Sequence, residues 1–181
     1  GATAWVRLGI GMLAWFLLVR AELQPSTMAF AVVLAGSGEA VVALLQVFAQ
    51  FAPASTVFGM AQHTAAAAGD AVIETDTGRF LRAYGTLPHP NIAGGWFAFA
   101  SVLAAGLYLR VHVWRHRIGL LVAFLMIQAG LFVTFSRAAL LGWVACLLVL
   151  TSAVLIRELL DARPWWRSFS FARSDPQLGH R

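Results

Sequence analysis

Three polar side chains share one face of a predicted helix inside an otherwise apolar stretch. Gln46 and Gln50 follow Glu39 by seven and eleven residues, so in a helix over residues 27–51 they point within about 20° of Glu39. A carboxylate in a membrane span is costly and usually faces the bundle interior or a wet cavity. Two interpretations are equally good: the stripe lines a cavity under the following loop, where Glu39 meets an acceptor hydroxyl or an arginine, or it forms interhelical hydrogen bonds.

A single arginine, Arg137, separates two apolar stretches, Ile118–Ser136 and Ala138–Ile156. Each stretch is close to the roughly 20 residues that cross the hydrocarbon core of a bilayer. Such an arginine can snorkel to water from a helix end. Its isolation between two apolar stretches nevertheless calls for an explanation.

The composition of the whole chain is that of a membrane protein. Hydrophobic residues make up 60% of the 181 residues and charged residues only 12%, and the mean hydropathy is +0.75. The net charge of +5 comes entirely from arginines that lie at the ends of apolar runs, so we expect no nucleic-acid partner. The histidines have no cysteine or carboxylate partner at ligand spacing, so we expect neither a metal nor another cofactor.

These features predict an all-α, polytopic transmembrane helix bundle with about five spans. We expect the spans at residues 2–19, 27–51, 91–109, 118–135 and 138–156, with Gly36-Ser37-Gly38-Glu39 interrupting the second. Residues 52–90 form a loop between spans two and three, in which Asp76-Thr-Gly78 favours the turn of a small β-hairpin. Residues 1–164 then form a single transmembrane domain, and residues 165–181 an irregular tail, as expected for an internal piece of a longer protein.

Arginine accumulates in cytoplasmic loops, and this rule predicts the orientation. Residues 110–117 and 157–181 hold most of the arginines, so we expect them in the cytoplasm. The loop 52–90 and Arg137 then face outward, to the periplasmic or extracellular side of the inner (cytoplasmic) membrane.

Three residues around the third span also have structural interpretations. Asn91 directly precedes an apolar helix, so we expect it to cap that helix before it touches a ligand. His89 could carry a proton near neutral pH, but a hydrogen bond within the loop is favoured. Arg79 lies three residues before Arg82, which places the two on opposite faces of an extended strand.

Three motifs occur in a recognisable order: Arg82-Ala-Tyr-Gly85, then His89-Pro90-Asn91 leading into an apolar helix, then Thr134-Phe-Ser-Arg137 at the next helical hairpin. This arrangement resembles the O-antigen ligase and O-antigen polymerase superfamily of bacterial membrane glycosyltransferases. The resemblance covers roughly residues 36–156. Members of that family carry a histidine on a larger outer loop downstream of the Ser-Arg pair, and no such loop follows within these 181 residues. We therefore expect the fragment alone to be inactive.

The resemblance implies a metal-independent glycosyltransferase that moves a glycan from undecaprenyl diphosphate to an acceptor at the outer face of the inner membrane. The acceptor would be a glycan, the lipid A core or a protein, and the bilayer is the remaining partner. Arg82 and Arg137 would be the catalytic residues, since guanidinium groups bind phosphate oxygens in bidentate fashion and neutralise the leaving diphosphate. The substrate-binding residues it implies are Arg79, Tyr84, His89, Asn91, Ser136 and Glu39.

Two other functions fit the same sequence. A transporter-like bundle would use Glu39 and the glutamines to line a pathway, and it predicts a second, similar half; no internal repeat is evident. A non-catalytic membrane subunit would only pack against partners, and it predicts that Arg82 and Arg137 point apart.

Overall fold

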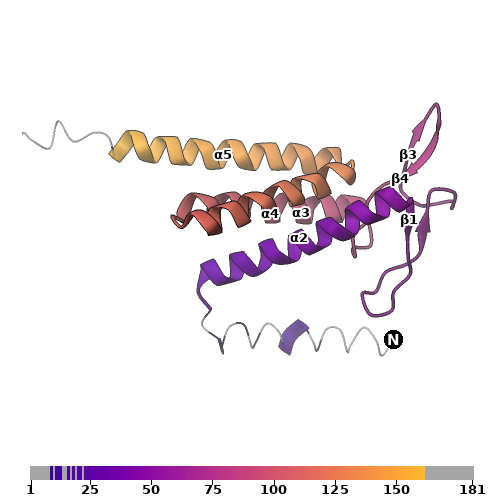
Figure 1. The fold of residues 1–181 in the computed structure, drawn as a ribbon, viewed down its shortest axis with the longest axis horizontal. Helices are drawn as coiled ribbons and strands as arrows, with labels where there is room; N and C mark the ends of the chain where they lie inside the picture. The colour runs from indigo at the N-terminus through magenta and orange to yellow at the C-terminus, as the bar shows by residue number, and fades with distance from the viewer. Residues whose placement is uncertain are drawn as a thin grey trace, which may run out of the picture. The chain divides into compact units, whose positions relative to one another are not determined.

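The computed structural model describes residues 23–161 without a break and, before them, only residues 9, 11–13, 16, 18, 20 and 21. In this part of the chain the structure is mostly helical, with four long helices and two small sheets (Figure 1). The chain forms two compact units, residues 1–144 and 145–181. The predicted first span at residues 2–19 lies mostly outside the described residues, and the predicted tail at residues 165–181 lies wholly outside them.

The four described helices are each long and apolar enough to cross a membrane: α2 (Pro25–Ala49), α3 (Pro90–Arg110), α4 (Trp114–Val133) and α5 (Arg137–Asp161). They overlap the predicted spans two to five, so the prediction of a helical membrane protein is confirmed at this level. The boundaries agree within two residues except at two places, where α4 begins four residues before residue 118 and α5 runs five residues past residue 156. Hydropathy marks the apolar part of a helix, whereas backbone hydrogen bonding continues into its polar ends.

Local sequence explains where the helices begin and continue. Pro25 and Pro90 occupy the first turns of α2 and α3, where the fixed φ of proline suits a helix and its missing N–H costs nothing. The predicted interruption of the second span was wrong, since α2 is continuous through residues 36–39. Gly36 is there for packing: a Cβ atom at this position would lie 2.8 Å from the Cβ of Ala100 on α3.

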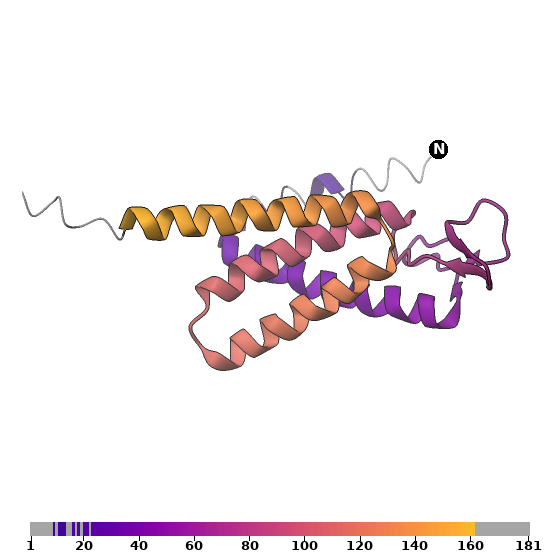
Figure 2. The same ribbon diagram turned by 90° about the horizontal axis from the view of Figure 1, so that it is seen from above.

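Helices α2, α3 and α4 pack side by side, as both ribbon views show (Figures 1 and 2). Their buried contacts are made largely by small residues, among them Ala40 of α2 and Ala100 of α3. A Cβ atom on Gly130 of α4 would lie 2.9 Å from the Cβ of Ala40. Small residues at helix contacts let the backbones approach closely, as in other membrane bundles.

Two antiparallel sheets of two strands each lie in the loop between α2 and α3. Strand β1 (Phe51–Ala52) pairs with β2 (His63–Thr64), and β3 (Val72–Thr75) pairs with β4 (Gly78–Leu81). In the second sheet Val72 is opposite Leu81 and Thr75 is opposite Gly78, so Asp76 and Thr77 form the turn between them.

The three packed helices have two different ends. At the loop end, where α2 ends, α3 begins and α4 ends, the backbone N–H of Ala83 donates to the carbonyl of Val133 at 3.1 Å. This bond ties the loop to the end of α4. At the turn end, residues 111–113 connect α3 to α4 beside the beginning of α2.

Candidate functional site

Arg82 is held at the loop end by two other segments of the chain. Its Nε donates to the carbonyl oxygen of Thr134 at 2.8 Å, and its Nη2 donates to Oδ1 of Asn91 at 2.8 Å. The side chain is half-buried. Burial lowers the pKa of the guanidinium and the nearby Tyr84 raises it, but an arginine stays charged at neutral pH. The site therefore contains a fixed, partly desolvated positive charge, whose Nη1 makes no hydrogen bond within the described residues.

His89, rather than Asn91, caps α3. Because Pro90 is the first helical residue, His89 takes the N-cap position, and its Nδ1 accepts a hydrogen bond from the backbone N–H of Asn91 at 3.1 Å. The prediction that Asn91 caps the helix was wrong. Asn91 lies inside the first turn, and its exposed side chain is left to orient Arg82.

The Ser-Arg pair begins α5 at the same end of the bundle. Ser136 is buried, and its hydroxyl oxygen accepts a hydrogen bond from the backbone N–H of Ala139 at 3.4 Å, so it acts as a cap of α5. The Arg137 side chain is exposed and makes no hydrogen bond or ion pair within the described residues. Arg137 follows Thr134, the residue that binds Arg82, by three positions, and three residues span at most about 11 Å. The two arginines thus start from neighbouring backbone.

The polar stripe of α2 holds the backbone of residues 81–86, which we call the anchored segment. Gln50 Oε1 accepts the N–H of Leu81 at 2.7 Å. Gln46 Oε1 accepts the N–H groups of Tyr84 and Gly85 at 3.0 and 2.9 Å, and its Nε2 donates to the Gly85 carbonyl at 2.7 Å.

Glu39 completes this stripe. Its carboxylate accepts the N–H of Thr86 at 2.8 Å and also the Thr86 hydroxyl. Glu39 and Gln46 lie on α2, whereas Gln50 is its left-handed C-cap, so the predicted helix through residue 51 was too long. The three side chains still bind one segment together, and their described hydrogen bonds go to the loop or to α2 itself, not to another helix.

Tyr84 and Arg79 have surroundings that the sequence did not suggest. Tyr84 is 3% exposed, and its hydroxyl accepts the N–H of Ala71 at 2.7 Å, so it packs within the loop. Arg79 lies on β4, whereas Arg82 follows the end of that strand, and Arg79 faces Glu74 across the sheet at 3.6 Å. The contacts of Arg79 in the described structure are thus with the hairpin, not with the segments that hold Arg82.

Sequence reasoning missed a further pair of side chains in the loop. His63 Nδ1 lies 2.7 Å from Asp70 Oδ1, and the imidazole ring stacks on Tyr84 with the ring centroids 3.9 Å apart. The N–H of Thr64 donates to the other carboxylate oxygen of Asp70 at 2.8 Å. The hydrogen bond from His63 lowers the pKa of Asp70. The residues of this pair are seven apart in an Ala- and Gly-rich stretch with no periodicity, so no sequence signal was available.

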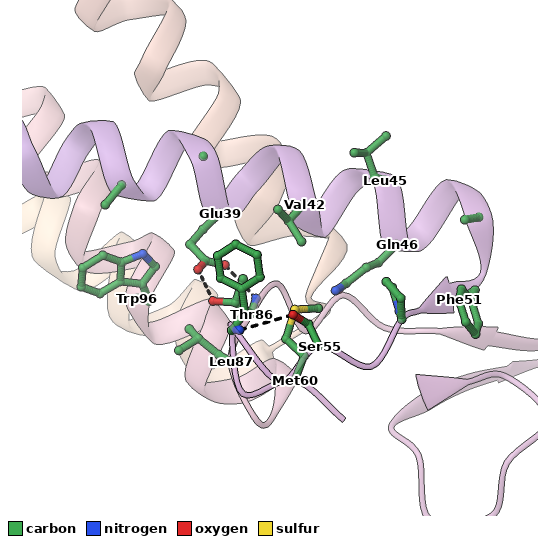
Figure 3. A pocket seen from close by; sticks show the side chains of 15 residues that line it. Glu39, Val42, Leu45, Gln46, Phe51, Ser55, Met60, Thr86, Leu87 and Trp96 are labelled. Atoms are coloured by element: carbon green, nitrogen blue, oxygen red, sulfur yellow. Dashed lines mark hydrogen bonds between the residues drawn. The ribbon is translucent and has the colours of Figure 1, made fainter. Parts of the chain in front are cut away.

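A cavity of about 1010 Å³ lies beside the anchored segment, between α2, the loop and α3 (Figure 3). Its lining is mostly apolar, from residues such as Val42, Leu45 and Trp96. The polar members Glu39, Gln46, Ser55 and Thr86 all have hydrogen bonds within the protein. The wall offers little to a polar ligand and suits a hydrocarbon chain.

Comparison of the chain with models of protein families, with curated proteins and with solved structures found no match to any of them. Within residues 23–161 and the few described residues before them, no group of three or more His, Cys, Asp or Glu side chains is placed to hold a metal ion.

Proposed function

We propose that this chain is part of a membrane glycosyltransferase of the O-antigen ligase or polymerase type. It transfers a glycan from undecaprenyl diphosphate to an acceptor at the outer face of the inner membrane. One observation carries the proposal: the Arg82 guanidinium is held by Asn91 and by Thr134, which is three residues before Arg137, where α5 begins. All three motifs of the family resemblance contribute to this one place.

The chemistry follows from the two charges. As the bond between the sugar and the diphosphate breaks, negative charge grows on the leaving diphosphate oxygen. A guanidinium that is already oriented stabilises this charge without reorganisation at the moment of reaction. Asn91 and the Thr134 carbonyl orient Arg82, while Arg137, with no described partner, is free to bind the second phosphate.

The apolar cavity gives this proposal a place for the hydrocarbon part of the donor. It is lined by α2 and α3, two helices of membrane length, and by the loop that carries the anchored segment. A lipid with a charged head needs both an apolar surface and a cation at the membrane boundary. The loop end supplies both.

Alanine substitution in the full-length protein tests the proposal. We expect Arg137→Ala to lower glycan transfer in cells by about a hundredfold or more, as the loss of one transition-state donor does elsewhere. This is the cleaner variant, because Arg137 makes no described contact that folding would lose. Arg82→Ala should have the same effect, whereas Arg79→Ala, on the neighbouring hairpin, is the matched control and should leave transfer unchanged. Full transfer by Arg137→Ala, at normal protein level in the membrane, would overturn the assignment.

A further inference from the structure

A second cavity lies at the turn end, far along α2 from the anchored segment. It has a volume of about 600 Å³ and is enclosed by the beginning of α2, the end of α3 and the beginning of α4. Most of its polar lining comes from the first turns of two helices: Ser26 and Thr27 on α2, Arg115 and His116 on α4. The remaining polar side chain, Ser37, donates its hydroxyl to the Val33 carbonyl of its own helix. One to two helical turns further into the bundle the lining is apolar, with Phe30, Leu34 and Leu120. One end of the cavity thus carries cationic side chains and hydroxyl groups, and the rest of the lining is mostly apolar.

Within the described residues, no ion pair compensates the positive charge at the turn end. Residues 110–117 contain three arginines and two histidines, and the sequence contains no Asp or Glu from residue 82 to residue 157. The ion pairs found in the described part of the chain join His63 to Asp70 and Arg79 to Glu74, both in the loop. The described structure therefore provides no internal counter-ion for Arg115.

The beginning of α4 adds to the positive electrostatic potential at the turn end, because the positive end of the helix dipole lies there. Val113 is the N-cap and has no side-chain acceptor, and the first turn holds Arg115, His116 and Arg117 but no acidic residue. Cations at the positive end of a helix dipole are unfavourable, whereas an anion there is stabilised. Arg117 stacks over the ring of Tyr108, 4.6 Å from its centroid, and its Nε is buried with no acceptor among the described residues.

We propose that this cavity binds an anionic glycerophospholipid of the bilayer. The lipid phosphate lies against Arg115 and His116 at the start of α4, within reach of the hydroxyl groups of Ser26 and Thr27. One acyl chain lies along Phe30, Leu34 and Leu120. Free phosphate would fill only the cationic end and leave the apolar part to water, so a lipid is the ligand that matches both parts. The site is separate from the arginines of the loop end, and it does not depend on the proposed glycosyl transfer.

The test uses the full-length protein in detergent, titrated with phosphatidylglycerol or with phosphatidylcholine, while thermal unfolding and native mass spectrometry report binding. We expect phosphatidylglycerol to bind and to raise the unfolding midpoint more than phosphatidylcholine does. The double variant Arg115→Gln/His116→Gln should bind phosphatidylglycerol about tenfold more weakly. Arg110→Gln is the matched control, because it removes the same charge at the same end from a residue that does not line the cavity.

A second variant tests the acyl part without changing any charge. Gly119 lines the cavity, and a Cβ atom there would meet no heavy atom within 4 Å, so Gly119→Leu should fill the space without disturbing the helices. We expect it to lose the preference for phosphatidylglycerol as well. If Arg110→Gln weakens binding as much as the double variant, the interaction is diffuse surface charge and the site is refuted. If inorganic phosphate alone gives the full stabilisation, or Gly119→Leu binds normally, the acyl assignment is wrong.

Discussion

The loop between α2 and α3 contains two neighbouring regions that are held in different ways. The anchored segment, residues 81–86, is hydrogen-bonded to the side chains of Glu39, Gln46 and Gln50 and contains buried Leu81, Tyr84 and Gly85. The hairpin of β3 and β4, apart from Leu81 at its base, is half-buried or exposed. Its cross-strand side-chain contacts are the ion pair between Arg79 and Glu74 and, next to the turn, a hydrogen bond from the Thr75 hydroxyl to the Gly78 carbonyl.

This difference shows how a loop can carry a fixed charge outside the helices. A buried backbone without partners would be costly, and the side chains of α2 supply the missing donors and acceptors. Arg82 lies within the anchored segment, so the hydrogen bonds that fix the backbone on both sides of Arg82 also fix where its side chain starts. The hairpin side chains beyond Leu81 have no hydrogen bond to α2 in the described structure, so the charge of Arg79 is held by the cross-strand ion pair with Glu74 instead.

The largest effect should follow the loss of Gln46. Gln46→Leu removes three hydrogen bonds to Tyr84 and Gly85 in a buried place. Each unpaired buried group costs about 1–3 kcal/mol, so the free energy of unfolding should fall by about 3–5 kcal/mol, measured by chemical unfolding in detergent. Gln128→Leu on α4 is the control, since Gln128 is also buried but its Oε1 has no partner in the described structure. An equal loss in both variants would contradict the anchoring role.

A smaller effect should separate two glycines of the loop that both have φ in the left-handed helical region, one inside the anchored segment and one outside it. Gly85 has φ +62°, and a Cβ atom there would lie 2.5 Å from Glu39 Oε2, whereas Gly59 has φ +68° and no heavy atom within 4 Å of such a Cβ atom. Alanine is strained to a similar extent at both sites, but only Gly85→Ala also displaces the Glu39 carboxylate. We expect a loss of about 2 kcal/mol or more for Gly85→Ala and a smaller loss for Gly59→Ala. The difference between their unfolding midpoints measures the contribution of the anchor, and equal midpoints would argue against it.

The pH dependence of stability should reveal the pair of His63 and Asp70, which closes residues 63–70, the part of the loop directly before β3. The hydrogen bond from His63 lowers the pKa of Asp70 below 3.8, so its stabilising effect is present above pH 3.8 and is lost as the pH falls through the lower, folded-state value. Asp70→Asn should therefore destabilise the protein at pH 7, and the difference from the natural sequence should shrink at lower pH. Unfolding midpoints at pH 7, 5 and 3 check this. A difference that is constant over this range would mean that Asp70 acts through packing alone.

Apolar length predicted the four described helices, and helical periodicity predicted that Glu39 and Gln46 act together. Gln50 joins them although it lies past the end of α2, in the left-handed conformation that periodicity did not predict. Neither could identify what the stripe binds, because its partners are backbone groups of a segment that begins 31 residues after Gln50. Backbone N–H and C=O groups are the same at every residue and leave no pattern in a sequence. The contact of Arg82 with the Thr134 carbonyl was hidden for the same reason.

The error at the beginning of α3 has a different origin. The apolar run starts after Asn91, and hydropathy alone therefore placed the cap there. Proline is suited to the first helical position, so the helix begins at Pro90 and the cap is His89. Reading Pro90 as the first helical residue would have given the correct cap and would have freed Asn91 for Arg82.

The smallest effect should come from the hairpin ion pair. Arg79 and Glu74 are 3.6 Å apart with side chains 40% and 77% exposed, and exposed pairs of this kind contribute about 0–1 kcal/mol. Arg79→Ala and Glu74→Ala should each change the free energy of unfolding by less than about 1 kcal/mol, and added salt should remove what little coupling a double-mutant cycle detects. A coupling well above this limit would show that the hairpin is held as firmly as the anchored segment. The contrast between the well-anchored Arg82 and the weakly held Arg79 would then fail.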